Sequence, residues 1–222
     1  VVVDYPGFNM KIAKIAHEKG IPVVSYISPS AWAWHKSRAK KVAQIVDKVA
    51  AIFPFEYDVY HEAGADTVFV GHPLLDIVKP SMPRKEAEAF AGKREGRKLV
   101  LLMPGSRLME IEKMLPTLLL AAKVLQQRMP EVDFTMPRAG TIPLELLESK
   151  IKEAGIEVKI TEGNNYDLFS VADLALATSG TVTLEAALCG LGSVIVYRTS
   201  AINAFIARGV INIPNIGLPN IV

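Results

Sequence analysis

The sequence predicts an α/β protein built from two doubly wound parallel sheets. Along its 222 residues, short apolar runs alternate with longer helical stretches, as expected of repeated βαβ units. Half of the residues are hydrophobic, which is enough for one large core or two modest ones. The stretch from Pro73 to Arg97 holds three prolines and many charged residues, and it divides the pattern into two series. We therefore expect two domains, each with its own sheet.

The first domain is expected over residues 1–80 and the second over residues 98–222, with a linker at 81–97. In the first domain we expect strands at 1–3, 22–27, 48–53 and 67–72 and helices at 8–19, 36–46 and 56–63. In the second we expect strands at 99–103, 132–136, 157–160, 172–177 and 194–197 and helices at 107–127, 144–154, 166–170, 182–189 and 201–208. Because ligands of such sheets bind beyond the carboxyl ends of the strands, the residues that follow each strand are the candidates for chemistry.

Composition excludes several classes of function. Lys and Arg exceed Asp and Glu by only two, which gives no overall field of the kind that nucleic-acid binders show. The single cysteine, Cys189, is typical of a structural thiol in a reducing compartment. No apolar run reaches the roughly 20 residues that span a bilayer, and no signal sequence is recognisable, so we expect a cytosolic protein. The sequence contains no zinc-type Cys/His spacing, nucleophile elbow or Walker loop.

The turn Ser179-Gly180-Thr181 is the first candidate site. It follows an expected buried strand and opens a helix, so backbone N–H groups, the helix dipole and the two hydroxyls favour a bound phosphate there. Glu185, one turn further on, is suited to holding a ribose diol. The alternative is an ordinary helix cap followed by a solvated glutamate. The residues of this turn alone do not decide between the two interpretations.

The motif Pro104-Gly105-Ser106-Arg107 is the second candidate anion site. Gly105 and Ser106 offer backbone donors at the start of a long helix, and Arg107 adds a permanent cation with forked donors. The alternative is that Ser106 caps the helix and that Arg107 and Glu110 are surface charges.

Two residues after strands of the first domain are candidates for proton chemistry. Asp4 fits a general base at a ligand-binding edge, or an Asx turn that starts the next helix. His72 fits a base, a phosphate donor or a hydrogen-bonded structural residue.

An aromatic and basic group also lies in the first domain, where Trp32 and Trp34 are followed by His35, Lys36, Arg38, Lys40 and Lys41. Its candidate site residues are Trp32, Trp34, Lys36 and Arg38. Such a group fits a membrane interface or a phosphate on an acceptor. The alternative is a buried Trp pair beside a solvated helix face.

Eight strings in the chain, taken together and in order, closely resemble the lipid-A-disaccharide synthase family. The strings are DYPGFN (Asp4–Asn9), SYISPSAWAW (Ser25–Trp34), FPFE (Phe53–Glu56), FVGHPLLD (Phe69–Asp76), LMPGSRLMEI (Leu102–Ile111), ATSGTVTLEAAL (Ala177–Leu188), VYR (Val196–Arg198) and LPN (Leu218–Asn220). Each string by itself is weakly specific, but their order and spacing from end to end make the resemblance specific.

The resemblance implies a GT-B glycosyltransferase with two Rossmann-like domains facing a cleft. Members of this family join UDP-2,3-diacylglucosamine to 2,3-diacylglucosamine 1-phosphate and release UDP and a β-1′,6-linked disaccharide. The UDP-sugar is a substrate, and no cofactor or metal is implied. The expected surroundings are the cytoplasm of a Gram-negative bacterium and, peripherally, the cytoplasmic face of the inner membrane. Nucleic acid is not an expected partner, and the oligomeric state stays open.

The resemblance also implies residue roles. Asp4 resembles the base that deprotonates the acceptor 6-hydroxyl, and Arg107 would offset charge on the leaving UDP. The turn at 179–181 would hold the diphosphate, and Glu185 would hold the ribose. The other matching residues on the donor side, without individual roles, are Gly105, Ser106, Glu110, Tyr197, Arg198 and Asn220. The acceptor or lipid side would include Trp32, Trp34, Lys36, Arg38 and His72.

Two further expectations qualify this interpretation. The chain begins with Val1-Val2-Val3-Asp4 and ends at Ile221-Val222, so we expect a piece of a longer protein that is inactive alone. The alternatives are another UDP-sugar enzyme of GT-B shape, such as the muramyl-peptide GlcNAc transferase or UDP-GlcNAc 2-epimerase, and a noncatalytic nucleotide- or lipid-binding module. The strings around Asp4 and Trp32 favour the lipid enzyme.

Overall fold

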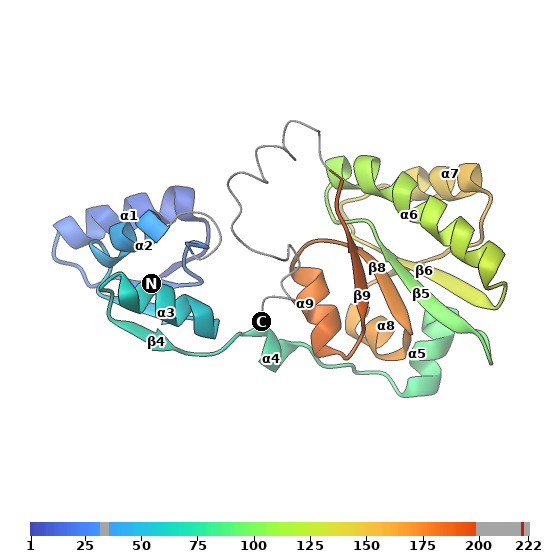
Figure 1. The fold of residues 1–222 in the computed structure, drawn as a ribbon, viewed down its shortest axis with the longest axis horizontal. Coiled ribbons are helices and arrows are strands. Elements are labelled where there is room, and N and C mark those ends of the chain that lie inside the picture. The colour runs from blue at the N-terminus through green and yellow to red at the C-terminus, as the bar shows by residue number, and fades with distance from the viewer. Residues whose placement is uncertain (32–35, 199–218, 220–222) are drawn as a thin grey trace. The chain divides into compact units, whose positions relative to one another are not determined.

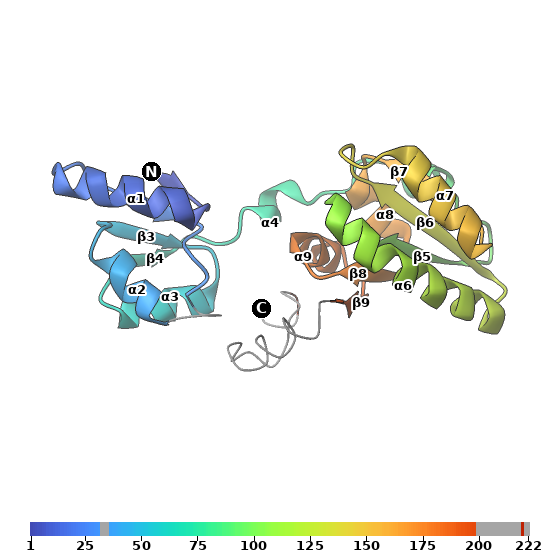
Figure 2. The ribbon, with the colours of Figure 1, turned by 90° about the horizontal axis from the view of Figure 1, so that it is seen from above.

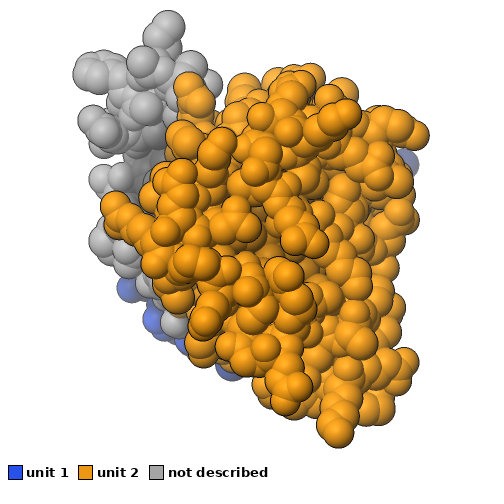
Figure 3. All heavy atoms as spheres, turned by 90° about the vertical axis from the view of Figure 1, so that its right-hand side faces the viewer, with its two compact units in different colours: residues 1–75, 202–214 blue, residues 76–201, 215–222 orange. Residues whose placement is uncertain are grey.

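The computed structural model describes residues 1–31, 36–198 and 219. These residues belong to two compact units, coloured separately in Figure 3. Of the described residues, unit 1 holds those in the range 1–75, and unit 2 holds 76–198 and 219. Each unit contains one parallel sheet with helices packed on it (Figures 1 and 2). The prediction of two α/β units with parallel sheets is confirmed.

The sheet of unit 1 has its strands in chain order. These strands are β1 (Val2–Val3), β2 (Val24–Tyr26), β3 (Lys48–Ala51) and β4 (Thr67–Phe69). The helices between them are α1 (Pro6–Glu18), α2 (Lys36–Ala43) and α3 (Pro54–Glu62), and the short α4 (Leu74–Ile77) follows β4. One apolar cluster joins the first three helices to the sheet, with Ala13, Val42, Val49 and Tyr60 at its centre. Small residues and one aromatic ring therefore hold α1, α2 and α3 on a common core.

The sheet of unit 2 has the strand order β7-β6-β5-β8-β9. The strands are β5 (Lys98–Met103), β6 (Val132–Arg138), β7 (Lys159–Glu162), β8 (Leu174–Thr178) and β9 (Ser193–Val196). The chain begins at the centre, runs outward through β6 and β7, and then returns to the other side of β5 for β8 and β9. The order therefore reverses between β5 and β8, which is where doubly wound sheets bind ligands.

Alternate residues of β5 face two different cores in unit 2. Val100 and Leu102 pack with α6 (Leu108–Arg128) and α7 (Leu144–Ala154). Leu99, Leu101 and Met103 pack with α5 (Arg84–Ala91), α8 (Asn165–Val171) and α9 (Thr181–Leu188). Because successive strand residues point to opposite faces, helices cover both sides of the sheet (Figure 1).

The segment at 81–97 differs from the expected linker. It contains α5, whose Ala87 and Ala91 are completely buried in unit 2. The Asp167 carboxylate on α8 accepts hydrogen bonds from the backbone N–H groups of Ser81 at 2.6 Å and Met82 at 2.7 Å. The charged residues that made this stretch resemble a linker therefore lie around an apolar helix stripe that belongs to the core. The helix expected at 201–208 lies outside the described residues.

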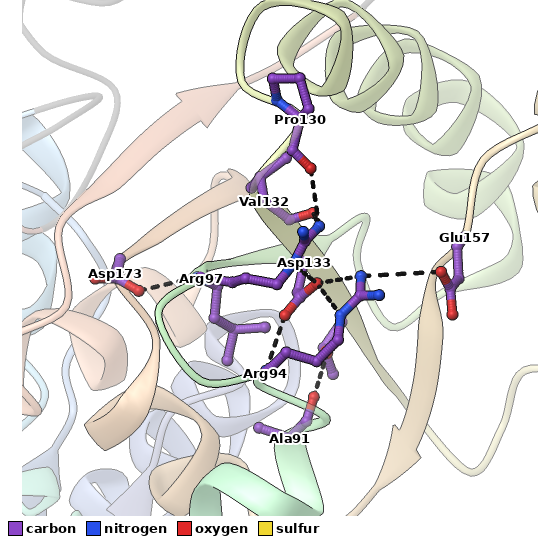
Figure 4. Close-up of polar contacts among 10 residues, drawn as sticks. Ala91, Arg94, Arg97, Pro130, Val132, Asp133, Glu157 and Asp173 are labelled. Atoms are coloured by element: carbon purple, nitrogen blue, oxygen red, sulfur yellow. Dashed lines mark hydrogen bonds and ion pairs between the residues drawn. The ribbon is translucent and has the colours of Figure 1, made fainter.

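Asp133 forms a charged clamp at the amino-terminal edge of the second sheet (Figure 4). Its side chain is only 5% exposed and accepts from Nε of Arg94 and Nε of Arg97, both at 2.8 Å, and from the Arg94 backbone N–H at 2.9 Å. Burial by itself raises the pKa of Asp133, but these hydrogen bonds outweigh it and hold the pKa below the usual range. The clamp ties the end of the expected linker to β6.

Replacing Asp133 with Ala is expected to lower the free energy of unfolding by roughly 3 kcal/mol, because the partly buried Arg97 loses its partner. Because folding lowers this pKa, the contribution is present above about pH 4 and fades as the pH falls. Urea denaturation at pH 7 measures the loss. The matched control is Glu157→Ala, since Glu157 is 84% exposed and 3.9 Å from Arg94. Equal losses in the two variants would contradict the clamp.

Candidate functional site

The carboxyl ends of the strands in unit 2 surround a pocket of about 400 Å³, which we call the β5–β8 pocket. Met103 of β5 lies opposite Ala177 of β8 in the sheet register, so the loops that follow these two strands are neighbours. The described lining of the β5–β8 pocket includes Gly105, Ser106, Arg107, Glu110, Ser179, Gly180 and Thr181. The structure thus brings the two sequence-predicted anion motifs together at the point where the strand order reverses.

Helix α9 begins at this pocket. Its N-cap residue is Gly180, which has an extended backbone with φ 174° and offers no capping side chain. The Thr183 hydroxyl donates back to the Gly180 carbonyl at 2.7 Å, which closes the first turn. Thr181 and Val182, the first helical residues, line the pocket. The N-cap position of this turn therefore carries no side chain, and the positive end of α9 lies at the pocket wall.

The start of α6 is different, because a carboxylate of the protein already accepts from the two backbone N–H groups that precede the helix. The Glu110 carboxylate accepts from the backbone N–H of Ser106 at 3.1 Å and of Arg107 at 3.3 Å, and it pairs with the Arg107 guanidinium at 2.7 Å. Burial by itself raises the pKa of Glu110, but the bonds from the Arg107 side chain and the two amides hold it below the usual range. Capping thus occurs at this turn, but by Glu110 instead of Ser106.

Gly105 is required by this capping arrangement. Its φ is 116°, in the region that favours glycine. A Cβ atom added at Gly105 would lie 2.5 Å from Oε2 and 2.8 Å from Cβ of Glu110. The glycine of the motif therefore makes room for the glutamate, and the Arg107 side chain at the pocket is 80% exposed.

A second pocket of about 350 Å³ shares Arg107, Glu110 and Thr178 with the first. It is also lined by two residues of the VYR string, Tyr197 and Arg198. The Tyr197 side chain is exposed, and the Arg198 backbone N–H lies 3.2 Å from Sδ of Met114. Tyr197 and Arg198 therefore lie beside the β5–β8 pocket, as neighbours of Arg107.

Three polar residues outside the predicted set of site residues also line the β5–β8 pocket: Arg138, Asn165 and Thr178. Arg138 pairs with Glu162 and donates to the Ile142 carbonyl at 2.5 Å. It was missed because β6 was expected to end at Met136, whereas the strand continues to Arg138. The Thr178 hydroxyl is buried and has no hydrogen-bond partner among the described residues.

Glu185 is not among the described residues that line either pocket. It is half-buried on α9, and burial raises its pKa. The pKa values of Tyr166 and Cys189 are raised first by the burial of these two side chains and second by the charge of Glu185. Glu185 therefore lies close to both side chains. The expected contact of Glu185 with a ribose stays a prediction.

In unit 1, Asp4 lies exposed at the carboxyl end of β1 in an unusual backbone conformation. Asp4 and Tyr5 have φ of 48° and 42°, values in the left-handed region that Asp and Asn tolerate but that are strained for most other residues except glycine. The Asn9 side-chain amide donates to the Asp4 carbonyl at 2.8 Å, and the Asp4 N–H donates to the Tyr26 carbonyl at 3.2 Å. The N-cap residue of α1 is Tyr5, which has no side-chain cap bond, so Asp4 lies one residue before the N-cap position.

His72 is held by local contacts in the same unit. Its Nδ1 accepts the Leu74 backbone N–H at 3.1 Å, and its ring centroid is 4.9 Å from that of Phe53. Burial lowers its pKa, which favours the neutral ring with the proton on Nε2. These contacts support the structural interpretation and leave Nε2 as a donor.

The remaining predicted residues are described only in part. Lys36 begins α2, and Arg38 is exposed on the same helix, whereas Trp32, Trp34 and Asn220 lie outside the described residues. Within the described ranges, no group of three or more His, Cys, Asp or Glu side chains is placed to hold a metal ion. None of the described helices has the length and apolar character needed to cross a membrane.

Comparison with known proteins gives the family. The family model described as lipid-A-disaccharide synthetase matches residues 1–222. Lipid-A-disaccharide synthases from Geobacter metallireducens and Syntrophus aciditrophicus are each 42% identical and match the whole chain. The chain spans 58% of the length of each of these relatives.

Solved structures with low sequence identity share the fold. A UDP-GlcNAc 2-epimerase from Neisseria meningitidis, bound to UDP-GlcNAc, matches with a TM-score of 0.60 and 16% identity over 96% of this chain and 63% of its own. A putative epimerase of the same kind from Listeria monocytogenes matches with a TM-score of 0.64 and 12% identity over 99% of this chain and 62% of its own. This likeness confirms the predicted GT-B-type architecture of two Rossmann-like units. With the family model matched from end to end, the chain belongs to the lipid-A-disaccharide synthase family.

Proposed function

We propose that the full-length protein transfers the diacylglucosaminyl group of UDP-2,3-diacylglucosamine to the 6-hydroxyl of 2,3-diacylglucosamine 1-phosphate. The products are UDP and a β-1′,6-linked disaccharide. Membership of the family over residues 1–222 supports this reaction class. The observation that carries the donor side is the β5–β8 pocket, where the start of α9 and Arg107 meet at the switch point of the sheet.

We assign the donor diphosphate to the start of α9. Glu110 already accepts from the N–H groups of Ser106 and Arg107, whereas the N-cap residue of α9 provides no side chain for its first turn. The dipole of α9 and the Arg107 cation both stabilise negative charge, which grows on the diphosphate as the sugar leaves. Glu185 holds the ribose in this proposal, and Glu110, Tyr197, Arg198 and Asn220 belong to the donor side.

Asp4 acts as the general base in this proposal. Its carboxylate takes the proton of the acceptor 6-hydroxyl while that oxygen attacks the anomeric carbon of the donor, and the bond to UDP breaks. This single displacement inverts the anomeric centre and gives the β linkage. The acceptor carries acyl chains, so we place the enzyme in the cytoplasm, peripherally at the inner membrane. Trp32, Trp34, Lys36, Arg38 and His72 are assigned to the acceptor side.

The test of this function is a direct assay of the full-length protein. UDP-2,3-diacylglucosamine and UDP-GlcNAc are compared as donors, with 2,3-diacylglucosamine 1-phosphate as acceptor, and products are identified by mass spectrometry. We expect the disaccharide and UDP only with the acylated donor. Formation of UDP-ManNAc from UDP-GlcNAc would instead assign an epimerase. The 222-residue chain alone is expected to be inactive.

Replacing Gly180 with Ala separates ligand binding from folding. A Cβ atom at this position meets no atom within 4 Å and the backbone is extended, so the unfolding temperature is expected to stay unchanged. The added methyl group stands at the N-cap of α9, where the diphosphate approaches the backbone, so the Kd for UDP is expected to rise about tenfold. Calorimetric titration measures it. Gly192→Ala, which also meets no atom within 4 Å, is the control, and an unchanged Kd in Gly180→Ala would remove the diphosphate from this turn.

A further inference from the structure

Unit 1 contains a pocket of about 590 Å³ between α1 and α2, which we call the α1–α2 pocket. Its volume lies in the range of small-molecule sites. The described lining is largely apolar and includes Pro6, Met10, Pro29, Val42 and Ile45. A nucleotide needs many polar partners, whereas a hydrocarbon chain needs only such a surface.

Three cations belong to the same lining: Lys14, Arg38 and Lys41. Arg38 and Lys41 are exposed, and neither makes an ion pair within the described chain. Lys14 has only a distant and solvated partner, Glu18 at 3.8 Å. The described lining contains no acidic residue, so this pocket combines an apolar wall with an uncompensated positive rim. That combination is complementary to an anionic amphiphile.

The pocket also begins next to the proposed base. Pro6 and Gly7, which line it, follow Asp4 by two and three residues. Pro29, which also lines it, follows β2, whose Tyr26 carbonyl accepts the Asp4 N–H. A sugar whose hydroxyl lies at Asp4 therefore has an apolar, cationic surface within reach on the same unit.

We propose that the α1–α2 pocket binds the acceptor, with an acyl chain along Met10, Val42 and Ile45 and the 1-phosphate at Arg38 and Lys41. This inference rests on the function proposed above. It adds Lys14 to the acceptor side, gives Arg38 and Lys41 a specific ligand, and makes the phosphate the group that the pocket selects. Guanidinium and ammonium groups bind phosphate through charge-assisted hydrogen bonds.

The test compares the double variant Arg38→Ala, Lys41→Ala with wild type in the full-length protein. We expect the KM for 2,3-diacylglucosamine 1-phosphate to rise about tenfold and the KM for the UDP-sugar to stay unchanged. With 2,3-diacylglucosamine that lacks the phosphate, the two proteins should behave alike. The control is Lys11→Ala, Lys19→Ala, which removes two exposed charges of unit 1 that do not line the pocket.

The apolar wall is tested by Met10→Trp, which fills the space from a half-buried position. We expect this variant to raise the acceptor KM more for long-chain than for short-chain acceptors, with an unchanged unfolding temperature. An unchanged acceptor KM in the double variant overturns the inference. Weaker binding to anionic vesicles at unchanged KM also overturns it and assigns the surface to the membrane. If wild type makes no disaccharide at all, the proposed function fails instead.

Discussion

Replacing Asp4 with Asn is expected to lower kcat about 1000-fold, the middle of the range for loss of a general base. The amide has nearly the shape of the carboxylate but cannot take the proton of the attacking hydroxyl. UDP affinity should stay unchanged, because the Asn side chain keeps the shape of Asp and Asp4 is not among the described residues that line the β5–β8 pocket. Steady-state kinetics with both substrates saturating, together with UDP titration, measure the two quantities.

Asn is preferable to Ala at this position because of the backbone. Asp4 has φ 48°, a conformation that Asn adopts more readily than Ala, so Asp4→Ala would mix strain with chemistry. Asp58, exposed on α3 of the same unit, provides the control Asp58→Asn, which is expected to keep full activity. If Asp4→Asn retained most of the wild-type kcat, Asp4 would not be the base and the acceptor hydroxyl would need another partner.

Replacing Arg107 with Ala is expected to lower kcat by about 100- to 1000-fold, the effect of removing one charge-stabilising donor from a transition state. The cation acts where negative charge develops on the leaving UDP, so the main effect is on kcat, with a smaller one on the donor KM. Arg107→Lys should recover only part of the activity, because an ammonium group lacks the forked geometry of the guanidinium.

The Arg107–Glu110 pair needs its own control. The Arg107 side chain is 80% exposed, and exposed pairs contribute about 0–1 kcal/mol to stability, so Arg107→Ala should unfold at nearly the wild-type temperature. Glu110→Gln keeps a side chain that accepts the two amide bonds but loses the charge. If Arg107 served only to pair with Glu110, the two variants would lose activity equally. We expect the loss in Glu110→Gln to be much smaller.

Local sequence pattern was sufficient for most elements of the fold. Helix 144–154 and strand 99–103 were predicted within a residue of α7 and β5, because a buried stripe or run fixes the period of apolar residues. The prediction of a linker at 81–97 was wrong because the apolar stripe of α5 is short. Charged residues dominate the composition of this segment, while only two alanines of α5 are fully buried in the core. The composition of a segment does not show which of its residues are buried against the rest of the unit.

The site was predictable as a set of loops but not as an arrangement. Residues after strands indicated the turns at Gly105 and Gly180. No local signal showed that Glu110 would cap the turn at Gly105 or that Gly180 would be the N-cap residue at the other turn. Arg138 was not predicted as a site residue, because β6 continues two residues beyond the expected end of the strand at Met136.

The sequence by itself determined the alternation of strands and helices, the two sheets and, through eight ordered strings, the family. Those features depend on short-range periodicity and on residue identity, which the chain displays directly. Only the tertiary structure decided that β5 and β8 are neighbours although about seventy residues separate them, so that two anion motifs share one pocket. It also decided that Lys14, Arg38 and Lys41 line one apolar pocket from two helices. Such pairings depend on packing between segments far apart in the chain, and no local pattern encodes them.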